Sequence, residues 1–240
     1  MNVLGIDTCC MAATAAVITD DRLAAQVVQN NKKTHSQKIM PMIDFMLREA
    51  EMTVGDIDCF AAAAGPGSFT GVRIGIATIK ALAHAAGKPC AAVSTLHALA
   101  YNVADFGGII CPILDARRGQ VYNALFKGGS LERITDDRAL SAEELCDELE
   151  QMDESVIFVG DGLPVFAEMI NKRLGRRAVF ARRSQRMNLA ASVAEIGYDM
   201  LLLGDVCGYS ELKPRYLRLS QAEREKAERQ NLKEGGENAK

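Results

Sequence analysis

The sequence lacks several patterns that mark common classes of protein. Its 240 residues contain no run of about 18 apolar residues, so no membrane-spanning helix is expected. The first residues lead directly into a predicted strand, without the basic segment and apolar core of a signal peptide, so no secretion signal is expected. The seven cysteines include no C-x-x-C pair, and the adjacent Cys9 and Cys10 suit neither a zinc site nor an ordinary disulfide.

Motifs of catalysis and of nucleotide binding are also absent. None of the three histidines, His35, His84 and His97, has the H-x-x-x-H or H-E-x-x-H spacing that binds a metal from one helix face. Residues 65–69 read GPGSF, which differs from the G-x-S-x-G turn of a hydrolase nucleophile. Neither G-x-x-x-x-G-K-[ST] nor G-x-G-x-x-G occurs. The sequence therefore predicts no catalytic residue and no metal ligand in this chain.

The composition is that of a globular protein, since 48% of the residues are apolar. The formal net charge of −3 argues against sequence-independent binding of nucleic acid, which needs clustered lysine and arginine. One basic cluster, Arg176-Arg177 with Arg182-Arg183, is a candidate for direct RNA contact, although such clusters are more often solvated. Most cysteines lie inside apolar segments, as in reduced proteins, so the cytoplasm is the expected compartment.

Residues 65–75, with the sequence GPGSFTGVRIG, are the least generic part of the chain. They join a predicted strand to a predicted helix through a turn in which Gly65 and Gly67 are free to adopt positive φ. Free amides at the start of that helix favour an anion. The alternative, which we favour because no phosphate-binding motif matches, is that Gly71 and Gly75 allow another helix to pack closely.

Hydrophobic patterning predicts two halves with a similar order of elements. In the first half, strands are predicted at 3–7, 12–18, 23–28, 57–64 and 89–93, and helices at 34–51, 70–86 and 96–104. In the second half, strands are predicted at 109–115, 121–126 and 156–159, and helices at 141–151, 164–174 and 189–203. The repetition predicts an α/β protein of two lobes with mixed sheets flanked by helices, as in the actin-like (ASKHA, ribonuclease H-like) fold.

The predicted lobes span residues 1–106 and 107–219, with the last helix a candidate to pack back on the first lobe. Residues 220–240 are charged and show no apolar period, so a disordered tail is expected there.

The helix predicted at 34–51 has more apolar residues than one buried face needs. Between positions 39 and 50 these are Ile39, Met40, Met42, Ile43, Phe45, Met46, Leu47 and Ala50. One stripe needs about half of them, so Met40, Met42 and Phe45 are predicted on neighbouring or opposite faces. The next helix has a strip of mostly small residues at Gly71, Gly75, Thr78, Leu82 and Ala85. Either both helices contact another subunit, burying about 800 Å² on each side, or both are enclosed by their own chain.

Two carboxylates end corresponding strands of the two halves. Asp7 and Asp115 would face one cleft in a two-lobed fold, where they could hold magnesium or act as a base. The other interpretation, which we rate higher, is that each caps a turn. The first interpretation would make the chain an ATP-dependent small-molecule kinase or hydrolase of the actin-like superfamily.

Two stretches are specific enough to indicate a family: GPGSFTGVRIG at 65–75 and DARRGQVY at 115–122. Further matching stretches are GIDT at 5–8, HSQ at 35–37, STL at 94–96, GDG at 160–162 and PRYLR at 214–218. With these motifs the chain resembles the TsaB family, formerly YeaZ, over roughly residues 1–219. The resemblance implies an actin-like fold and membership of the machinery that forms N6-threonylcarbamoyladenosine at position 37 of tRNAs decoding ANN codons.

The resemblance also implies partners. Transfer is performed by the paralogue TsaD, with TsaE as ATPase, and the TsaB-like subunit is a non-catalytic scaffold that can form a homodimer when alone. ATP, magnesium and the TsaD metal belong to the partner subunits, and tRNA is bound through the complex. Cleft residues implied here are Asp7, Thr8, Asp115 and Arg118. The implied TsaD contacts lie on two N-lobe helices: His35, Ile39, Met42, Ile43, Phe45, Met46, Gly71, Arg73, Ile74, Gly75, Thr78 and Leu82.

Overall fold

The first lobe is built on a five-stranded mixed sheet. The computed structural model describes residues 1–31 and 34–218, and it begins with three antiparallel strands, β1 (Asn2–Asp7), β2 (Ala13–Thr19) and β3 (Arg22–Gln29). β4 (Cys59–Ala63) and β5 (Cys90–Val93) join in parallel, giving the order β3-β2-β1-β4-β5. Every residue of β4 is buried, as expected for a central strand covered on both faces.

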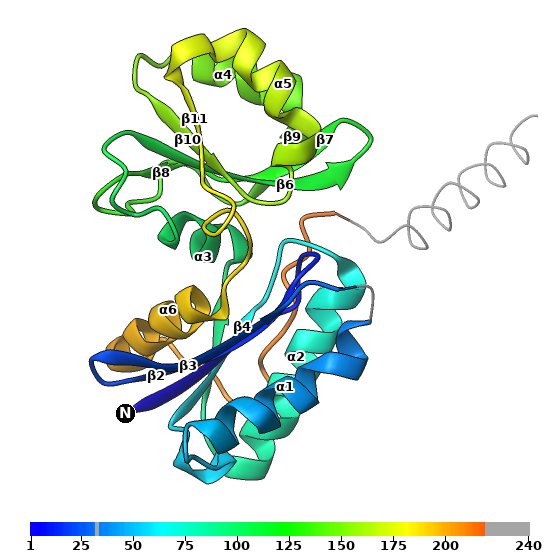
Figure 1. Ribbon diagram of the computed structural model, residues 1–240, viewed down its shortest axis with the longest axis vertical. Helices are drawn as coiled ribbons and strands as arrows, with labels where there is room; N and C mark the ends of the chain where they lie inside the picture. Colours follow the sequence, from blue (N-terminus) through cyan, green and yellow to red (C-terminus); the bar gives the residue numbers. More distant parts are fainter. Residues whose placement is uncertain (32–33, 219–240) are drawn as a thin grey trace, which may run out of the picture.

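Helices cover both faces of this sheet (Figure 1). α1 (His35–Glu49) and α2 (Phe69–Ala86) lie side by side on one face, and α6 (Ala190–Leu203) lies on the other. The approach of α6 is so close that a Cβ atom at Gly5 of β1 would lie 2.6 Å from the amide nitrogen of Ala194. A residue without a side chain in β1 therefore sets the distance between this helix and the sheet.

The second lobe holds a six-stranded sheet. Its strands are β6 (Ile109–Arg117), β7 (Gln120–Asn123), β8 (Phe126–Lys127), β9 (Arg138–Ser141), β10 (Val156–Val159) and β11 (Ala178–Phe180). The order is β11-β10-β6-β7-β9, with β8 also paired to β6. Its helices are α4 (Ala142–Glu150) and α5 (Leu163–Leu174), and α3 (Thr95–Tyr101) precedes its first strand. Short 3-10 turns lie at Val54–Asp56 in the first lobe and at Gly175–Arg177 between α5 and β11. α4 and α5 cover the outer face, whereas α3 lies between the lobes (Figure 1).

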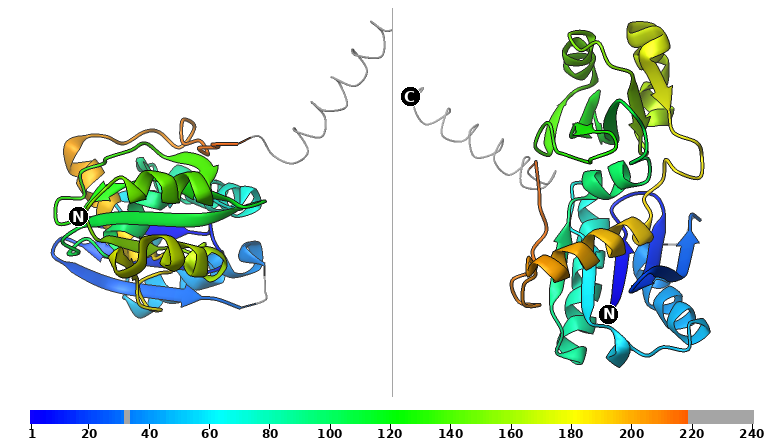
Figure 2. Two further views of the ribbon diagram at one scale, coloured as in Figure 1. Left: turned by 90° about the horizontal axis from the view of Figure 1, so that it is seen from above. Right: turned by 90° about the vertical axis from the view of Figure 1, so that its left-hand side faces the viewer.

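The chain passes from the second lobe back to the first. After β11 it returns as α6, and residues 205–218 then run along the first lobe toward the junction (Figures 1 and 2). One hydrophobic cluster is continuous across the junction, because it joins the first sheet to Ile110, Phe126 and Ile157 of the second. A second cluster fills the space between the second sheet and α4 with α5. The two lobes therefore share a core at the junction.

Most predicted elements are confirmed, but one predicted strand is divided in two and two short strands were missed. The predicted strand 121–126 is divided into β7 and β8, which pair with different parts of β6. Asn123 stands at the break, where its side-chain amide donates to the carbonyls of Pro112 and Ala124 at 3.0 Å each. These bonds satisfy carbonyl groups where the ladder stops. β9 and β11, with four and three residues, carry too little alternation to be recognised.

Two further expectations concern the C-terminal tail and membrane-spanning helices. The predicted tail, 220–240, lies outside the described residues. Among residues 1–31 and 34–218, none of the helices combines the length and the hydropathy that crossing a bilayer requires.

The contact between α6 and β1 gives a stability prediction. Gly5→Ala places a methyl group against the α6 backbone, which cannot move aside as a side chain can, so the free energy of unfolding should fall by about 2–3 kcal/mol. Gly107→Ala is the matched control, because a Cβ atom there meets no atom within 4 Å. Denaturant unfolding measures both. Equal stability of the two variants would contradict the packing argument.

Candidate functional site

A cleft of about 730 Å³ lies between the lobes. The first lobe contributes the β1–β2 turn, the start of α1 and the turn before α2, and the second lobe contributes the end of β6 with the turn that follows. The lining residues used below are Cys10, Met11, His35, Ser68, Asp115, Arg117, Arg118, Asp161 and Arg218. Because both lobes supply polar side chains, the cleft is the natural candidate for a small-molecule site.

Asp7 lies beneath this cleft at the end of β1. Its side chain is buried, and Oδ1 accepts a hydrogen bond of 2.7 Å from the amide of Cys9. Oδ2 has no hydrogen-bond partner among the described residues. Burial raises the pKa of Asp7 to about 6, although the bond from the Cys9 amide opposes the increase. The interpretation of Asp7 as a turn cap is supported, and one carboxylate oxygen is left over.

Two further carboxylates of the cleft, Asp115 and Asp161, belong to the second lobe. Asp115 accepts hydrogen bonds from the amide of Arg117 at 2.8 Å and from its guanidinium at 3.3 Å, so it also caps its turn. Asp161, which follows β10, accepts a bond of 3.3 Å from the Asp115 amide. Burial raises the pKa of Asp161. In the sequence Asp161 is recognisable only as part of the GDG motif. A carboxylate between two glycines at the end of a strand could have indicated a cleft residue.

Arginines form the rim of the cleft. Arg117 and Arg118 both have left-handed backbone conformations, with φ of 67° and 55°, which non-glycine residues adopt at a cost of about 1 kcal/mol or more. Arg118 is exposed. Arg218 donates from its guanidinium to the carbonyl of Ala116 at 2.8 Å. The cleft therefore combines an acidic floor with a basic rim.

The predicted cleft residues occupy different depths. Asp115 and Arg118 line the cleft, whereas Thr8 is buried and donates its hydroxyl to the Gly71 carbonyl at 2.7 Å. A Cβ atom at Gly71 would lie 1.9 Å from the Thr8 carbonyl oxygen. The interpretation that these glycines allow close packing is therefore correct. The element that packs against them is the turn after β1, so the expectation of another helix there is wrong.

The turn itself has the predicted conformation. Gly65 and Gly67 have φ of 114° and 157°. Ser68 caps α2 by accepting a bond of 3.3 Å from the Gly71 amide, so this helix start is already partly satisfied within the chain.

Several residues predicted on the partner face of α1 and α2 are instead core residues. Ile39, Met42, Ile43 and Met46 are 1–2% exposed, and the placement of Met42 on an outer face is wrong. These side chains are covered because α1 packs across β2 and β3 and against α2. On α2, Gly71, Gly75 and Leu82 are buried too.

His35 belongs to the cleft and not to the helix face. Its Nε2–H donates to the Cys10 carbonyl at 2.8 Å, and its buried Nδ1 has no partner among the described residues.

An exposed helix face remains after these corrections. On α1, Phe45 is 50% exposed and Met40 is 47% exposed. On α2, Arg73 is exposed and Ile74 and Thr78 are half-buried, with Ala77 and Ala81 exposed beside them. We call this set the helix face: Met40, Phe45, Arg73, Ile74, Ala77, Thr78 and Ala81.

Two aromatic residues border the helix face near the cleft. Phe69 at the start of α2 stacks on Tyr216, with ring centroids 4.9 Å apart. Arg73 donates from Nε to the Tyr216 hydroxyl at 2.7 Å, and its guanidinium lies over the same ring. Sequence analysis did not identify Tyr216 individually, because nothing local in the sequence shows that position 216 returns to α2.

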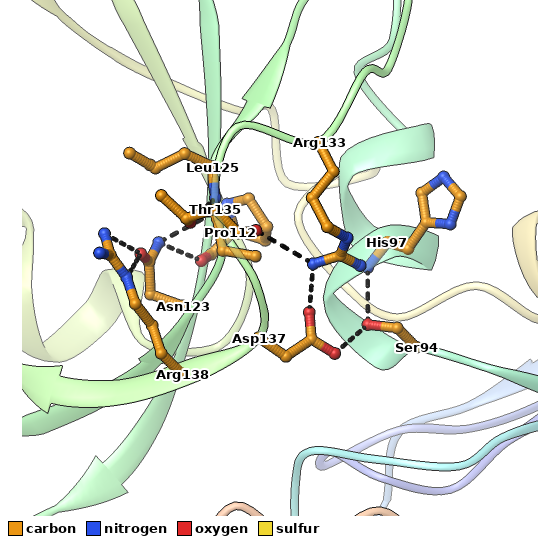
Figure 3. A network of polar contacts seen from close by, with 10 residues as sticks. Ser94, His97, Pro112, Asn123, Leu125, Arg133, Thr135, Asp137 and Arg138 are labelled. Carbon is orange, nitrogen blue, oxygen red and sulfur yellow. Dashed lines mark hydrogen bonds and ion pairs between the residues drawn. The ribbon is translucent and has the colours of Figure 1, made fainter.

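The third histidine, His97, lies in a packed network between the lobes (Figure 3). Its ring stacks on Phe126 at 5.5 Å, and burial, with the charge of Arg133, lowers its pKa. Ser94 donates to Asp137 at 2.6 Å, and Asp137 also accepts from Arg133 at 2.6 Å. His97 therefore packs beside the hydrogen bonds of Ser94, Arg133 and Asp137, which join the two lobes. Within residues 1–31 and 34–218, no group of three or more His, Cys, Asp and Glu side chains is arranged to hold a metal ion.

Comparisons with known proteins place the chain in a family. A family model described as TsaD, tRNA N6-adenosine threonylcarbamoyltransferase, matches residues 22–234. A Bacillus subtilis protein described as tRNA threonylcarbamoyladenosine biosynthesis protein TsaB is 36% identical over 93% of this chain and 96% of the relative. The chain belongs to the TsaB family. The Escherichia coli TsaB protein is 29% identical over 91% of this chain and 95% of its own length.

A solved structure supports the same relationship. The crystal structure of a Pseudomonas aeruginosa protein described as similar to peptidase YeaZ has a TM-score of 0.77 and 25% identity, covering 90% of this chain and 99% of that one. The two mixed sheets flanked by helices form an actin-like fold. The predicted family and fold are thus confirmed. The β1–β2 turn that lines the cleft contains no glycine, and Cys10 and Met11 are among the lining residues.

The raised pKa of Asp7 gives a pH-dependent prediction. Since the carboxyl binds its proton more tightly in the folded protein, its ionisation costs stability as pH rises from about 4 to 6, and the full cost remains above pH 6. Asp7→Asn removes this charge and keeps an oxygen for the Cys9 amide. Its free energy of unfolding should exceed that of the native chain by about 1–2 kcal/mol at pH 7.5, since the unpaired amide offsets part of the gain.

Denaturant titrations at pH 7.5 and pH 4 test this prediction. At pH 4 the carboxyl is protonated in the folded chain and about half protonated in the unfolded chain, so the cost of its charge is nearly gone while the unpaired amide of the variant remains. Asp7→Asn should therefore lose its advantage at pH 4 and be no more stable than the native chain. Asp21→Asn, at an exposed carboxylate of the β2–β3 turn, is the control and should change neither value by more than about 0.5 kcal/mol. A stability gain that is the same at both pH values would show that charge is not its cause.

Proposed function

We propose that this chain is a non-catalytic subunit of the machinery that makes N6-threonylcarbamoyladenosine at position 37 of tRNAs decoding ANN codons. Membership of the TsaB family supports the pathway, because the curated relatives are described as tRNA threonylcarbamoyladenosine biosynthesis proteins. The scaffold role is supported by the polar groups of the cleft. Asp7 and Asp115 are used as turn caps and Ser68 as a helix cap, so these three side chains are already engaged in holding the backbone.

The helix face is the surface through which we propose that a TsaD subunit binds. Phe45 supplies a half-exposed aromatic ring, and the small residues Ala77 and Ala81 leave room for a partner helix to approach α2. Large apolar side chains beside small ones are typical of packed helix pairs. The single observation that carries the proposal is the outward position of Phe45 and Met40 on a helix whose core positions are already filled by other residues.

The chemistry of the partner follows from family relationship. The family model that matches residues 22–234 is described as TsaD, which supports a partner of the same fold, and in this proposal that partner presents an equivalent helix pair. Equivalent surfaces pair across a two-fold axis, and pairing of this kind also allows two copies of this chain to associate when TsaD is absent. In this proposal TsaE and tRNA bind to the assembled complex in the cytoplasm, and ATP, magnesium and the catalytic metal belong to the partner subunits.

Phe45→Glu tests the helix face. A charge in the middle of a helix–helix contact should raise the Kd for TsaD about 30-fold or more, corresponding to about 2 kcal/mol, while the chain stays folded because the ring is half-exposed. Titration of labelled TsaD by the variant measures the Kd, and circular dichroism confirms folding. Reconstituted tRNA modification should fall in parallel at limiting protein concentration.

Val165→Glu is the matched control, because Val165 is an exposed apolar residue of α5 on the far lobe, 59% exposed. It should bind TsaD as the native chain does. Ile43 and Met46 are unsuitable for this test, since a charge at either buried position would unfold the lobe. If Phe45→Glu and Val165→Glu bind equally well, TsaD contacts another surface.

A second candidate function rests on the cleft. The buried, unpaired Oδ2 of Asp7 beneath an opening with Asp115, Asp161 and Arg118 is consistent with an ATP-dependent kinase or hydrolase. We favour the scaffold, because the β1–β2 turn, residues 8–12, contains no glycine whose bare backbone could closely approach phosphates. Direct RNA contact by the arginine cluster is disfavoured at Arg177, whose guanidinium donates to the carbonyls of Leu149 and Met152.

Calorimetry separates the two candidates. Injection of magnesium-ATP into the isolated chain should give no heat of specific binding if the chain is a scaffold. Micromolar binding that is lost in Arg118→Ala would support the cleft-based enzyme. Arg176→Ala, at an exposed arginine far from the cleft, controls for general loss of positive charge.

A further inference from the structure

Cys90 and Cys207 are 117 positions apart in sequence and face one another in the structure. They form an isolated antiparallel bridge between β5 and the segment that follows α6. The Cys90 amide donates to the Cys207 carbonyl at 2.8 Å, and the Cys207 amide donates to the Cys90 carbonyl at 2.9 Å. A pair that exchanges both bonds has Cα atoms about 5.5 Å apart, which is within the common range for disulfides.

Both side chains point to the same face of the sheet. Gly197 of α6 lies against Ala61 and Ala91, so these two alanines face α6. Cys90 neighbours Ala91 along β5 and must face the opposite side, toward α2. Cys207, directly across from Cys90, shares that side and lines an opening next to the C-terminal end of α2.

The two thiols differ in access. Cys90 is fully buried, whereas Cys207 is only partly buried and lines an opening of about 520 Å³ together with His84, Lys88 and Tyr209. A small oxidant can therefore reach the Cys207 sulfur first. Burial raises the pKa of both thiols, that of Cys90 to about 11, so the reaction is slow compared with that of an exposed thiolate.

We propose that Cys90 and Cys207 are an oxidation site whose disulfide fixes the C-terminal segment, residues 205–218, to the first lobe. A hydroperoxide oxidises the Cys207 thiol to a sulfenic acid and is reduced to water or an alcohol. The Cys90 thiolate then attacks the Cys207 sulfur, the S–S bond forms, and hydroxide leaves and takes up the proton given up by Cys90 as water. A dithiol reductant reverses the change.

The bond would reinforce a segment that is held by the buried side chain of Leu212 and by polar contacts. Lys80 donates to the carbonyls of Ser210 and Leu212 at 3.4 and 3.3 Å, and the Arg215 amide donates to Ala64 at 2.7 Å. Farther along, Tyr216 contacts α2 and Arg218 reaches Ala116 in the second lobe. Oxidation would therefore restrict the segment that joins the helix face to the cleft rim.

The test oxidises the full-length reduced chain with hydrogen peroxide over hours, blocks remaining thiols with N-ethylmaleimide, and maps tryptic peptides without reduction. The expected product links peptide 81–117 to peptide 187–215, and fragment ions assign the link to Cys90 and Cys207. Hydrogen exchange of amides in 208–217 should slow about 10-fold or more in the oxidised chain. The Tm should rise by about 5–10 °C, because the link closes a long loop in the unfolded chain.

Matched variants identify the pair. Cys207→Ser should abolish the link and both shifts, whereas Cys59→Ala should retain them, because Cys59 lies on the α6 face, two residues from Ala61. Exposed Met11, 69% exposed, reports that the oxidant has acted, through its sulfoxide. The proposal is overturned if Met11 is oxidised while Cys207 is recovered as its maleimide adduct, or if Cys207 links two chains.

Discussion

The contact of α6 with β1 is the constraint on which the rest of the structure depends. α6 reaches the first sheet after the chain has completed the second lobe, and Gly5 allows it to lie against the backbone of β1. Asn102 at the end of α3 also holds α6, because it accepts a hydrogen bond of 2.6 Å from Ser192 of that helix. Its amide donates to the carbonyls of Gln185 and Met187 in the segment that leads to α6. The first lobe is therefore complete only when α6, which follows the second lobe in sequence, has packed on the first sheet.

This arrangement decides which surfaces of the first lobe remain available. One face of the sheet is closed by α6, and the β5 edge is closed by the bridge between Cys90 and Cys207. The segment that continues from that bridge binds the start of α2 through Tyr216. The outer side of α1, the adjoining side of α2 and the cleft are not covered by any of these elements. Within residues 1–31 and 34–218, the helix face is thus left exposed.

The sequence predicted the parts of this structure that depend on local patterns. The positive φ angles of Gly65 and Gly67 were predicted from residue type, and both are present. Residue type and spacing also account for the observed Ser68 cap and Ser141–Glu144 capping box. Non-local packing was not predictable in the same way. The pattern of α1 does not show that the helix lies against both a sheet and α2, so Met42 was placed on an outer face although it is buried.

The cleft shows the same division between local and non-local information. Asp7 and Asp115 were recognisable as turn residues because each ends a strand, whereas the position of Arg218 at the rim depends on the path of the whole chain. The glycines of α2 were correctly associated with close packing. Their neighbour could not be identified, because only the folded chain shows that Thr8 lies against Gly71.

The turn from Thr8 to Met11 connects the two candidate surfaces. Asp7 holds the amide of Cys9, the carbonyl of Cys10 holds His35 at the start of α1, and Thr8 is bonded to the first turn of α2. The same few residues therefore line the cleft and position both helices of the helix face. Because ionisation of the buried Asp7 is unfavourable, its charge state affects the stability of the turn on which these helix starts depend. The carboxylate of Asp7 therefore has a structural role that requires no catalysis, since its oxygen fixes the turn.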